Sequence, residues 1–281
     1  MMKLQYQSDR SKYNLDKKFL LDDSSRPIYR YVSFFQLVEL LERKRLHLQK
    51  VCYWDDPSEG CGYLSSMQNM FIKETGENVE TIKSDITLED SIRKTYPFGT
   101  SWSLLPESDA MWRIYSQDKM GVKIQTSVKK LEQALSTVEF PKNCLELESF
   151  FDIEYVVGKV DYAEAKNIND IDHFLSKKEA FKHEEEVRGL VKFSITSDPK
   201  RLGKLNIQSD IKISAFFLGC KFPEWMYPHG DEVKFIYTRD IDFIEALRID
   251  PRADDRIVDT IKSYCRTKKF NNIERSGLYE K

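Results

Sequence analysis

Two glutamates and an arginine occupy every second position in one short segment of the chain. Glu184, Glu186 and Arg188 alternate there with Glu185 and Val187. Because successive side chains of a strand point to opposite faces, the two carboxylates and the guanidinium would share one face. One carboxylate could accept a hydrogen bond from a substrate hydroxyl while the other positions or deprotonates a nucleophile. The spacing fits either an acidic catalytic strand in a cleft or a solvated strand end.

The other face of this strand is expected to be apolar. Val187, Gly189, Val191 and Phe193 follow the two-residue period of a strand, which predicts that they face a core. The charged face is expected to stay outside the core, because burying an unpaired charge is costly. Arg188 would then orient one of the carboxylates.

A second candidate group is an arginine between two tyrosines, Tyr29-Arg30-Tyr31. A guanidinium can bind a phosphate through two parallel hydrogen bonds while aromatic rings stack on a base or another ring. The alternative is an edge arginine whose stem packs on the neighbouring tyrosines. The motif therefore indicates either a phosphate site or an ordinary strand edge.

Hydroxyl and aromatic side chains form a third group. Ser101 and Ser103 would point to the same side of a strand, where their hydroxyls suit a sugar or a catalytic carboxylate. Trp112 and Tyr115 are three residues apart and would share one helix face. For this aromatic pair, core packing is the alternative.

A fourth group contains Asp55, Asp56 and Glu59, in a segment that also holds proline, serine and glycine. This composition is typical of a tight turn, although adjacent carboxylates can also ligate a hard cation. We favour the turn, since metal ligands seldom sit side by side without further partners.

Several strands and helices must position these groups. We expect strands over residues 27–32, 46–51, 98–104, 122–126, 151–162, 211–218, 233–238 and 243–249. We expect helices over residues 34–44, in pieces over 62–95, and over 170–182. Capping residues predict where four helices begin: a Ser33–Gln36 capping box for the first of these, Ser108 or Asp109 for another, Ser127 for another, and Asp250 followed by Pro251 for the last. The elements alternate without a regular βαβ rhythm, and neither a GxGxxG nor a P-loop pattern occurs. The expected fold class is α+β, with mixed, mostly antiparallel sheets and flanking helices.

The chain of 281 residues is long enough to bury a sizeable core. We expect a single α+β domain over residues 26–268, a flexible N-terminal segment over 1–25 and a polar C-terminal tail over 269–281. Apolar residues make up 41% and charged residues 32%, and the net charge is -2. So small a net charge does not predict that the chain as a whole is attracted to nucleic acid or to a membrane surface.

Composition also restricts the location and the cofactors. No window approaches the eighteen or so consecutive apolar residues of a membrane span, and the N-terminus lacks the apolar region of a secretory signal. The five cysteines are scattered and the histidines number only four, so we expect neither a disulfide framework nor a metal site. The reducing cytoplasm is the expected location.

Five short motifs, taken in order, resemble those of a bacterial and phage family known only as a domain of unknown function. The motifs are Tyr29-Arg30-Tyr31, Asp56-Pro57-x-Glu59-Gly60, Ser101-x-Ser103, Met111-Trp112-x-x-Tyr115 and Glu184-x-Glu186-x-Arg188. This resemblance covers residues 27–252, and the family label implies no activity.

Three segments more distantly resemble the mono-ADP-ribosyltransferases. That family carries, in order, an arginine or histidine on a first strand, a Ser-Thr-Ser-like strand, and a strand with Glu-x-Glu. The corresponding segments here are Arg30, Thr100–Ser103 and Glu184–Val187. The chain departs from the pattern at Trp102, where a small residue is usual, and at Arg188, where an apolar residue is usual. An ADP-ribosyltransferase-like fold, with NAD as a substrate and no metal, is what the resemblance implies.

The resemblance also implies residue roles. Arg30 would anchor a phosphate or ribose of NAD, a pair of serines would scaffold the pocket, and an aromatic side chain would stack on nicotinamide. Glu186 would hydrogen-bond the nicotinamide ribose and stabilise an oxocarbenium-like transition state, while Glu184 would orient the acceptor. The implied NAD-binding residues are Arg30, Tyr31, Ser101, Ser103, Trp112, Tyr115 and Arg188.

The leading hypothesis is therefore an NAD-consuming ADP-ribosyltransferase-like enzyme acting in phage defence or bacterial conflict. Its acceptor would be a protein or a nucleic acid, and the sequence does not identify which. A second hypothesis is a metal-dependent nuclease with Asp56, Glu59, Glu184 and Glu186 around magnesium, in which Arg188 replaces the expected lysine. A third is a non-catalytic module whose cleft binds a nucleotide or a peptide.

Overall fold

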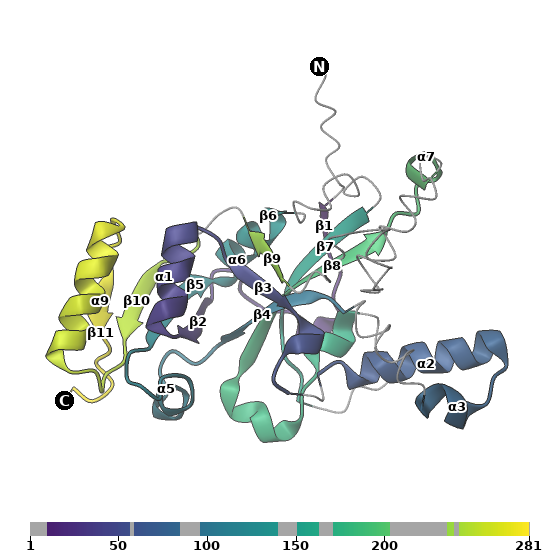
Figure 1. Cartoon of the computed structure of the whole chain (residues 1–281), viewed down its shortest axis with the longest axis horizontal. Helices are drawn as coiled ribbons and strands as arrows, with labels where there is room; N and C mark the ends of the chain where they lie inside the picture. The colour runs from purple at the N-terminus through teal and green to yellow at the C-terminus, as the bar shows by residue number, and fades with distance from the viewer. Residues whose placement is uncertain are drawn as a thin grey trace, which may run out of the picture.

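The computed structural model describes residues 10–56, 59–84, 96–139, 151–162, 171–202, 235–238 and 242–280. These residues form one branched sheet of eleven strands with helices around it (Figure 1). The main path runs β1-β7-β8-β4-β2-β5-β10-β11, and a branch leads from β4 through β3 and β9 to β6. Among the described pairings, β1 with β7 and β10 with β11 are parallel and the others are antiparallel. The expected α+β fold with a mixed, mostly antiparallel sheet is confirmed.

The strands mostly follow the predicted ranges. They are β1 (Arg10–Lys12), β2 (Pro27–Val32), β3 (His47–Lys50), β4 (Phe98–Ser103), β5 (Val122–Ser127), β6 (Val138–Glu139), β7 (Phe151–Lys159), β8 (Glu186–Ile195), β9 (Phe235–Thr238), β10 (Ala246–Ile249) and β11 (Ile273–Arg275). The strand expected over 211–218 lies outside the described residues.

Two pairs of helices lie at opposite ends of the sheet, α1 beside α9 at one end and α2 with α3 at the other, and α6 packs against its middle (Figure 1). The α-helices are α1 (Phe34–Arg43), α2 (Cys61–Thr75), α3 (Val79–Ser84), α5 (Asp109–Tyr115), α6 (Val128–Ser136), α7 (Pro199–Leu202) and α9 (Asp255–Thr267). The 3-10 segments are η1 (Lys17–Phe19), η2 (Val51–Tyr53), η4 (Ile171–Leu175) and η5 (Glu179–Glu184). No helix in the described ranges combines the length and the apolar character needed to cross a membrane.

Side-chain caps fix where several helices begin. At the start of α1, the Ser33 hydroxyl accepts from the backbone N–H of Gln36 at 3.2 Å, and the Gln36 side chain accepts from the Ser33 N–H at 2.9 Å. Ser108 caps α5 and Ser127 caps α6. These predicted starts are confirmed, because a short hydroxyl side chain satisfies a backbone donor that the first helical turn leaves unpaired.

The last helix begins later than predicted. Its N-cap is Asp254 and its first residue is Asp255, so the expected start at Asp250 and Pro251 is wrong. The Asp250 carboxylate does accept a backbone N–H, that of Arg252 at 2.8 Å, and it also accepts from Arg252 Nη2 at 2.7 Å. These bonds close a turn over residues 251–252, and the helix begins only after the second cap, at Asp254.

The single helix expected over 170–182 is also wrong, because the two 3-10 segments η4 and η5 replace it. Between them, Ser176 forms a parallel bridge with Asp161, and the N–H of Lys177 donates to the Asp161 carbonyl at 3.0 Å. Lys178 then has an extended backbone. This pairing just beyond β7 interrupts the helical hydrogen bonds and leaves Lys177 outside any helix.

Both ends of the chain add strands to the sheet where we expected flexible or polar segments. Near the N-terminus, β1 pairs with β7, and Leu15 and Phe19 are buried. Near the C-terminus, β11 pairs with β10 and buries Ile273. Strand edges carry unpaired backbone groups, which these short segments satisfy. The extent of a single domain over 26–268 stays a prediction.

The sheet separates a larger and a smaller apolar core. Val187, Val191 and Phe193 of β8 belong to the larger core, to which α1, α6 and α9 contribute. Leu190 of the same strand belongs to the smaller core, together with Phe174 and residues of α2. The alternation predicted for β8 is therefore confirmed by its packing.

A fork in the sheet positions the cleft. One edge of β4 pairs with β8 along the whole strand, from Phe98 to Ser103. The other edge pairs with β2 at Ser103 and with β3 at Phe98 and Gly99. Among the described strands, none pairs with this edge at Thr100 or Ser101. The two neighbours of β4 thus diverge where those side chains lie.

Candidate functional site

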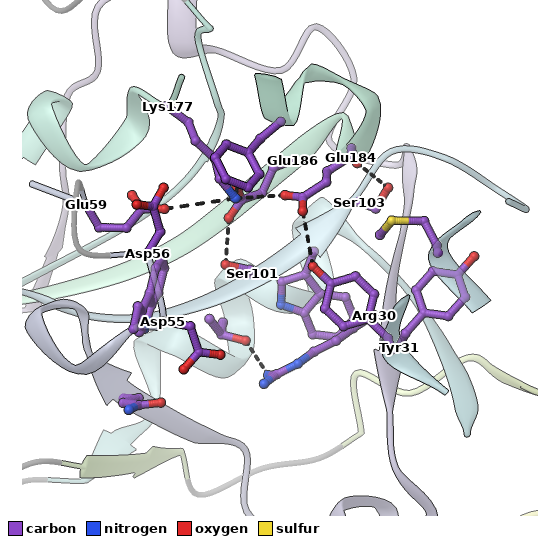
Figure 2. Close-up of a pocket in the computed structure, with 18 of the residues that line it drawn as sticks. Arg30, Tyr31, Asp55, Asp56, Glu59, Ser101, Ser103, Lys177, Glu184 and Glu186 are labelled. Carbon is purple, nitrogen blue, oxygen red and sulfur yellow. Dashed lines mark hydrogen bonds and ion pairs between the residues drawn. The ribbon is translucent and has the colours of Figure 1, made fainter. Parts of the chain in front are cut away.

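A cleft of about 590 Å³ opens at the fork between β2, β3 and β4. Pockets for small ligands commonly measure about 300–1,000 Å³, so the cleft is of ligand-binding size. Most of the predicted site residues line it (Figure 2), namely Arg30, Tyr31, Ser101, Ser103, Tyr115, Glu184 and Glu186. The two others, Trp112 and Arg188, are fully buried behind its wall.

Glu186 lies at the floor of the cleft and is surrounded by donors. Its Oε1 accepts from Ser101 Oγ at 2.6 Å and from Arg188 Nε at 2.8 Å. Its Oε2 accepts from Lys177 Nζ at 3.0 Å and from Arg188 Nη2 at 3.1 Å. The strand register explains part of this arrangement, because Ser101 of β4 lies opposite Arg188 of β8.

Arg188 is 0% exposed, although the sequence predicted a charged face outside the core. Its Nη1 and Nη2 bind the two carboxylate oxygens of Glu59, each at 2.7 Å, and Nη1 also donates to the Phe174 carbonyl at 2.7 Å. The guanidinium carbon lies 4.9 Å from the centre of the Trp54 ring. The prediction failed because it assumed an unpaired charge, and a bidentate partner makes burial tolerable. Arg188 therefore positions Glu186 from behind the cleft.

Lys177 is a site residue that the sequence analysis missed. Its Nζ lies 2.8 Å from Glu184 Oε2 and 3.0 Å from Glu186 Oε2, and its side chain is 10% exposed. The ammonium also lies 4.5 Å from the centre of the Phe181 ring. No motif contains this lysine, and it lies in the segment 170–182 that we expected to be a helix. Its place a few residues before an acidic strand is the one available signal.

Glu184 reaches the cleft by a different route from the one predicted. It ends η5 rather than standing on β8, and Glu185 takes a left-handed backbone conformation with φ 42°. This turn, and not a continuous strand, brings both carboxylates to Lys177. The Ser103 hydroxyl holds the turn by donating to the Glu184 carbonyl at 2.6 Å. On the cleft side, the Tyr115 hydroxyl donates to Glu184 Oε1 at 3.2 Å.

The surrounding cations keep Glu186 ionised. Burial alone would raise its pKa, but Arg188 and Lys177 outweigh burial and lower the pKa to about 2. Burial would likewise lower the pKa of Lys177, but Glu186 and Glu184 outweigh it and raise the pKa above its ordinary value. Burial and the nearby Glu184 raise the pKa of Tyr115 to about 12. At neutral pH, Glu186 and Lys177 thus form a charged pair, and the Tyr115 hydroxyl remains a hydrogen-bond donor.

Arg30 lies at the other end of the cleft. Its side chain is half-buried, and its Nη1 donates to the Thr100 hydroxyl. Among the residues that the structure describes, no carboxylate forms an ion pair with Arg30. Burial lowers the pKa of its guanidinium to about 10, which leaves it charged at neutral pH. A guanidinium without a carboxylate partner on a cleft wall is suited to bind an anion such as a phosphate.

The three predicted aromatic residues divide between cleft and core. Tyr115 lines the cleft and is 45% exposed. The Tyr31 ring stacks on it with centroids 6.3 Å apart, and Trp112 meets Tyr31 edge to face at 4.8 Å. Trp112 is fully buried, and its indole N–H donates to Glu107. For Trp112, the alternative prediction of core packing is therefore the one that the structure shows. Tyr115 therefore offers the ring most open to a ligand.

Three acidic residues, Asp55, Asp56 and Glu59, line the wall beyond β3 (Figure 2). Glu59 and Glu186 are both bonded to Arg188, so a guanidinium already occupies two of the carboxylates that the nuclease hypothesis placed around magnesium. Within the described ranges, no group of three or more histidine, cysteine, aspartate or glutamate side chains is arranged to hold a metal ion.

Comparisons with known proteins give a family match for part of the chain. Residues 111–189, from α5 into β8, match the model of a family described as a protein of unknown function (DUF2971). The predicted resemblance to a family of unknown function is confirmed for this segment. No curated protein matches the chain. Among solved structures, Thermus sp. 2.9 DarT in complex with ADP-ribosylated ssDNA is similar at 10% identity and a TM-score of 0.29, with 92% of this chain and 94% of that chain covered.

Proposed function

We propose that this protein binds NAD in the cleft and cleaves the bond between nicotinamide and ribose, as ADP-ribosyltransferases do. The observation that carries the proposal is the charge arrangement along the cleft. Arg30, which has no carboxylate partner among the described residues, lies at one end, and the carboxylates of Glu184 and Glu186 lie at the other.

This polarity matches the charges of NAD during the reaction. The diphosphate is an anion, which Arg30 would bind through paired hydrogen bonds. The nicotinamide ribose develops positive charge as its glycosidic bond breaks, and the acidic pair would stabilise that charge. Nicotinamide leaves with the bonding electrons, and an acceptor hydroxyl, an amine or water then attacks the ribose carbon and releases a proton.

The remaining predicted residues would support this chemistry indirectly. Ser101 and Ser103 bond to the Glu186 carboxylate and the Glu184 carbonyl, so they would scaffold the acidic pair. The exposed ring of Tyr115 would stack on a planar group such as nicotinamide. In a cytoplasmic setting, the reaction would deplete NAD or modify a macromolecule, in keeping with the predicted role in phage defence or bacterial conflict.

The test is incubation of the protein with labelled NAD, alone and with protein, DNA or RNA as acceptor. We expect nicotinamide release, followed by chromatography, and label on one acceptor class or in free ADP-ribose. Glu184→Gln should abolish release, while Glu185→Gln, at an exposed neighbouring position, should retain it. NAD binding without nicotinamide release would favour the non-catalytic binding module. If the protein neither binds NAD nor releases nicotinamide, the proposal is wrong.

A further inference from the structure

The Glu186 carboxylate has no acceptor position left for a ligand. An ionised carboxylate offers about four lone-pair positions on its two oxygens. Ser101 and Arg188 occupy both positions on Oε1, and Lys177 and Arg188 occupy both on Oε2. The side chain is 4% exposed. A substrate hydroxyl could bond this carboxylate only by displacing one of these donors.

The donors around Glu186 are themselves held in place. Arg188 is bonded to Glu59 through two nitrogens and to the Phe174 carbonyl, and it is fully buried. Withdrawing it from Glu186 would disturb this whole network. Lys177 is tied to a second carboxylate, Glu184, at 2.8 Å. The surroundings of Glu186 are therefore those of a group that maintains structure.

Glu184 has the opposite character. Among the described residues, its carboxylate has two hydrogen-bond donors, Tyr115 on Oε1 and Lys177 on Oε2. About two acceptor positions therefore remain on Glu184. Its side chain is 11% exposed and lines the cleft (Figure 2). Tyr115 also lines this cleft. A ligand hydroxyl can bond Glu184 without displacing a protein donor.

We infer that Glu184 is the carboxylate that hydrogen-bonds the ribose of a bound nucleotide, and that Glu186 is a positioning residue. Arg188 fixes Glu186, Glu186 holds the Lys177 ammonium, and that ammonium orients Glu184. The inference rests on the proposed function for the identity of the ligand. It reverses the roles that the sequence resemblance implied for the two glutamates.

ADP-ribose is the probe that tests this division. It carries the diphosphate and the ribose that reacts in NAD, but it has no nicotinamide to lose, so its binding is measured without turnover. We expect Glu184→Gln to weaken ADP-ribose binding in calorimetry by about tenfold or more. Its melting temperature without ligand should fall less than that of Glu186→Gln, because two protein donors bond the Glu184 carboxylate and four bond that of Glu186. Glu186→Gln should lower that melting temperature by about 5 °C or more, because it disturbs a buried charge network.

Two matched variants complete the experiment. Glu185→Gln, at the exposed position between the two glutamates, should match the wild type in both measurements. If Glu186→Gln does not fold, Tyr162→Phe replaces it, because the Tyr162 hydroxyl accepts the backbone N–H of Glu186 at 2.7 Å and Tyr162 does not line the cleft. Tyr162→Phe should lower the melting temperature and keep the ADP-ribose affinity within about twofold of wild type.

The results separate this inference from the proposed function. Wild-type affinity in Glu184→Gln would overturn the inference, and so would a wild-type protein that does not bind ADP-ribose. Lost affinity at unchanged melting temperature in Glu186→Gln or Tyr162→Phe would also overturn it. ADP-ribose binding that depends on Glu184, with no nicotinamide released from NAD, would contradict the proposed function alone. If Glu186→Gln abolished nicotinamide release at an unchanged melting temperature, and Glu184→Gln did not abolish it, the inference alone would be contradicted.

Discussion

The charged side chains at the two ends of the cleft differ in whether the protein itself supplies their oppositely charged partners. At the β8 end, Glu59, Glu186 and Arg188 are buried and joined by hydrogen bonds of 2.7–3.1 Å. At the β2 end, Arg30 is half-buried, and the Thr100 hydroxyl is its partner within the described part of the chain. The charges at the first end are satisfied within the protein, whereas the charge at the second is available to a ligand.

This difference separates stability from binding. A buried charge that loses its partner destabilises a protein strongly, because the remaining charge stays in surroundings of low dielectric constant. A cation without a partner on a cleft wall contributes little to folding but attracts anions. Substitutions at the two ends should therefore be distinguishable by whether unfolding or ligand binding changes.

The largest effect is expected from Arg188→Met. Methionine keeps much of the apolar stem but leaves Glu59 and Glu186 buried without their shared guanidinium. We expect the free energy of unfolding, measured in urea, to fall by about 3–5 kcal/mol. The control is Arg113→Met, which breaks an exposed ion pair with Asp109 and should change stability far less. Similar losses of unfolding free energy in the two variants would show that the buried network contributes no more stability than an exposed ion pair.

The next effect is expected from Arg30→Met, on binding rather than on folding. Loss of the guanidinium should weaken ADP-ribose binding by about tenfold to a hundredfold, measured by calorimetry. Arg30→Lys should recover part of the loss, because lysine keeps the charge but not the paired geometry. Arg26→Met, at an exposed position just before β2, should bind like wild type. If Arg30→Met instead destabilises the protein as much as Arg188→Met does, the contrast between the two ends is wrong.

The smallest effect concerns acid pH. The folded-state pKa of Glu186 is lowered from 4.5 to about 2, so its stabilising contribution is complete above the unfolded pKa and is lost as the pH falls through the folded pKa. Between about pH 6 and about pH 3, this contribution should fall by about 2 kcal/mol. Urea unfolding should therefore show the stability of wild type and Glu186→Gln converging over this range. A difference independent of pH would mean that Glu186 is not held ionised.

Features that depend on near neighbours could be predicted from the sequence. The apolar alternation of Val187 and Val191 and the capping box of Ser33 and Gln36 each involve residues a few positions apart. The structure confirms these local predictions, and also the α+β class. Backbone geometry alone relates such neighbours, so their side-chain types are sufficient to predict the arrangement.

The placement of the site was partly predictable, through motif order rather than through local pattern. Arg30 and Glu186 do line one cleft, as the resemblance implied. The route of Glu184 into it could not be predicted, since it depends on a left-handed turn at Glu185 that the Ser103 hydroxyl holds from another strand. The glutamate at position 185 does not signal that conformation, which glycine or asparagine would favour.

The amino-acid sequence alone thus establishes which strand carries Glu186 and which of its faces is apolar. The tertiary structure decides which charged side chains surround that strand. Arg188 is buried because Glu59, 129 positions earlier, reaches it, and the acidic pair is bridged because Lys177 arrives on an irregular segment. A buried charge depends on partners close in space, and their separation along the chain bears no relation to the period of a strand or helix.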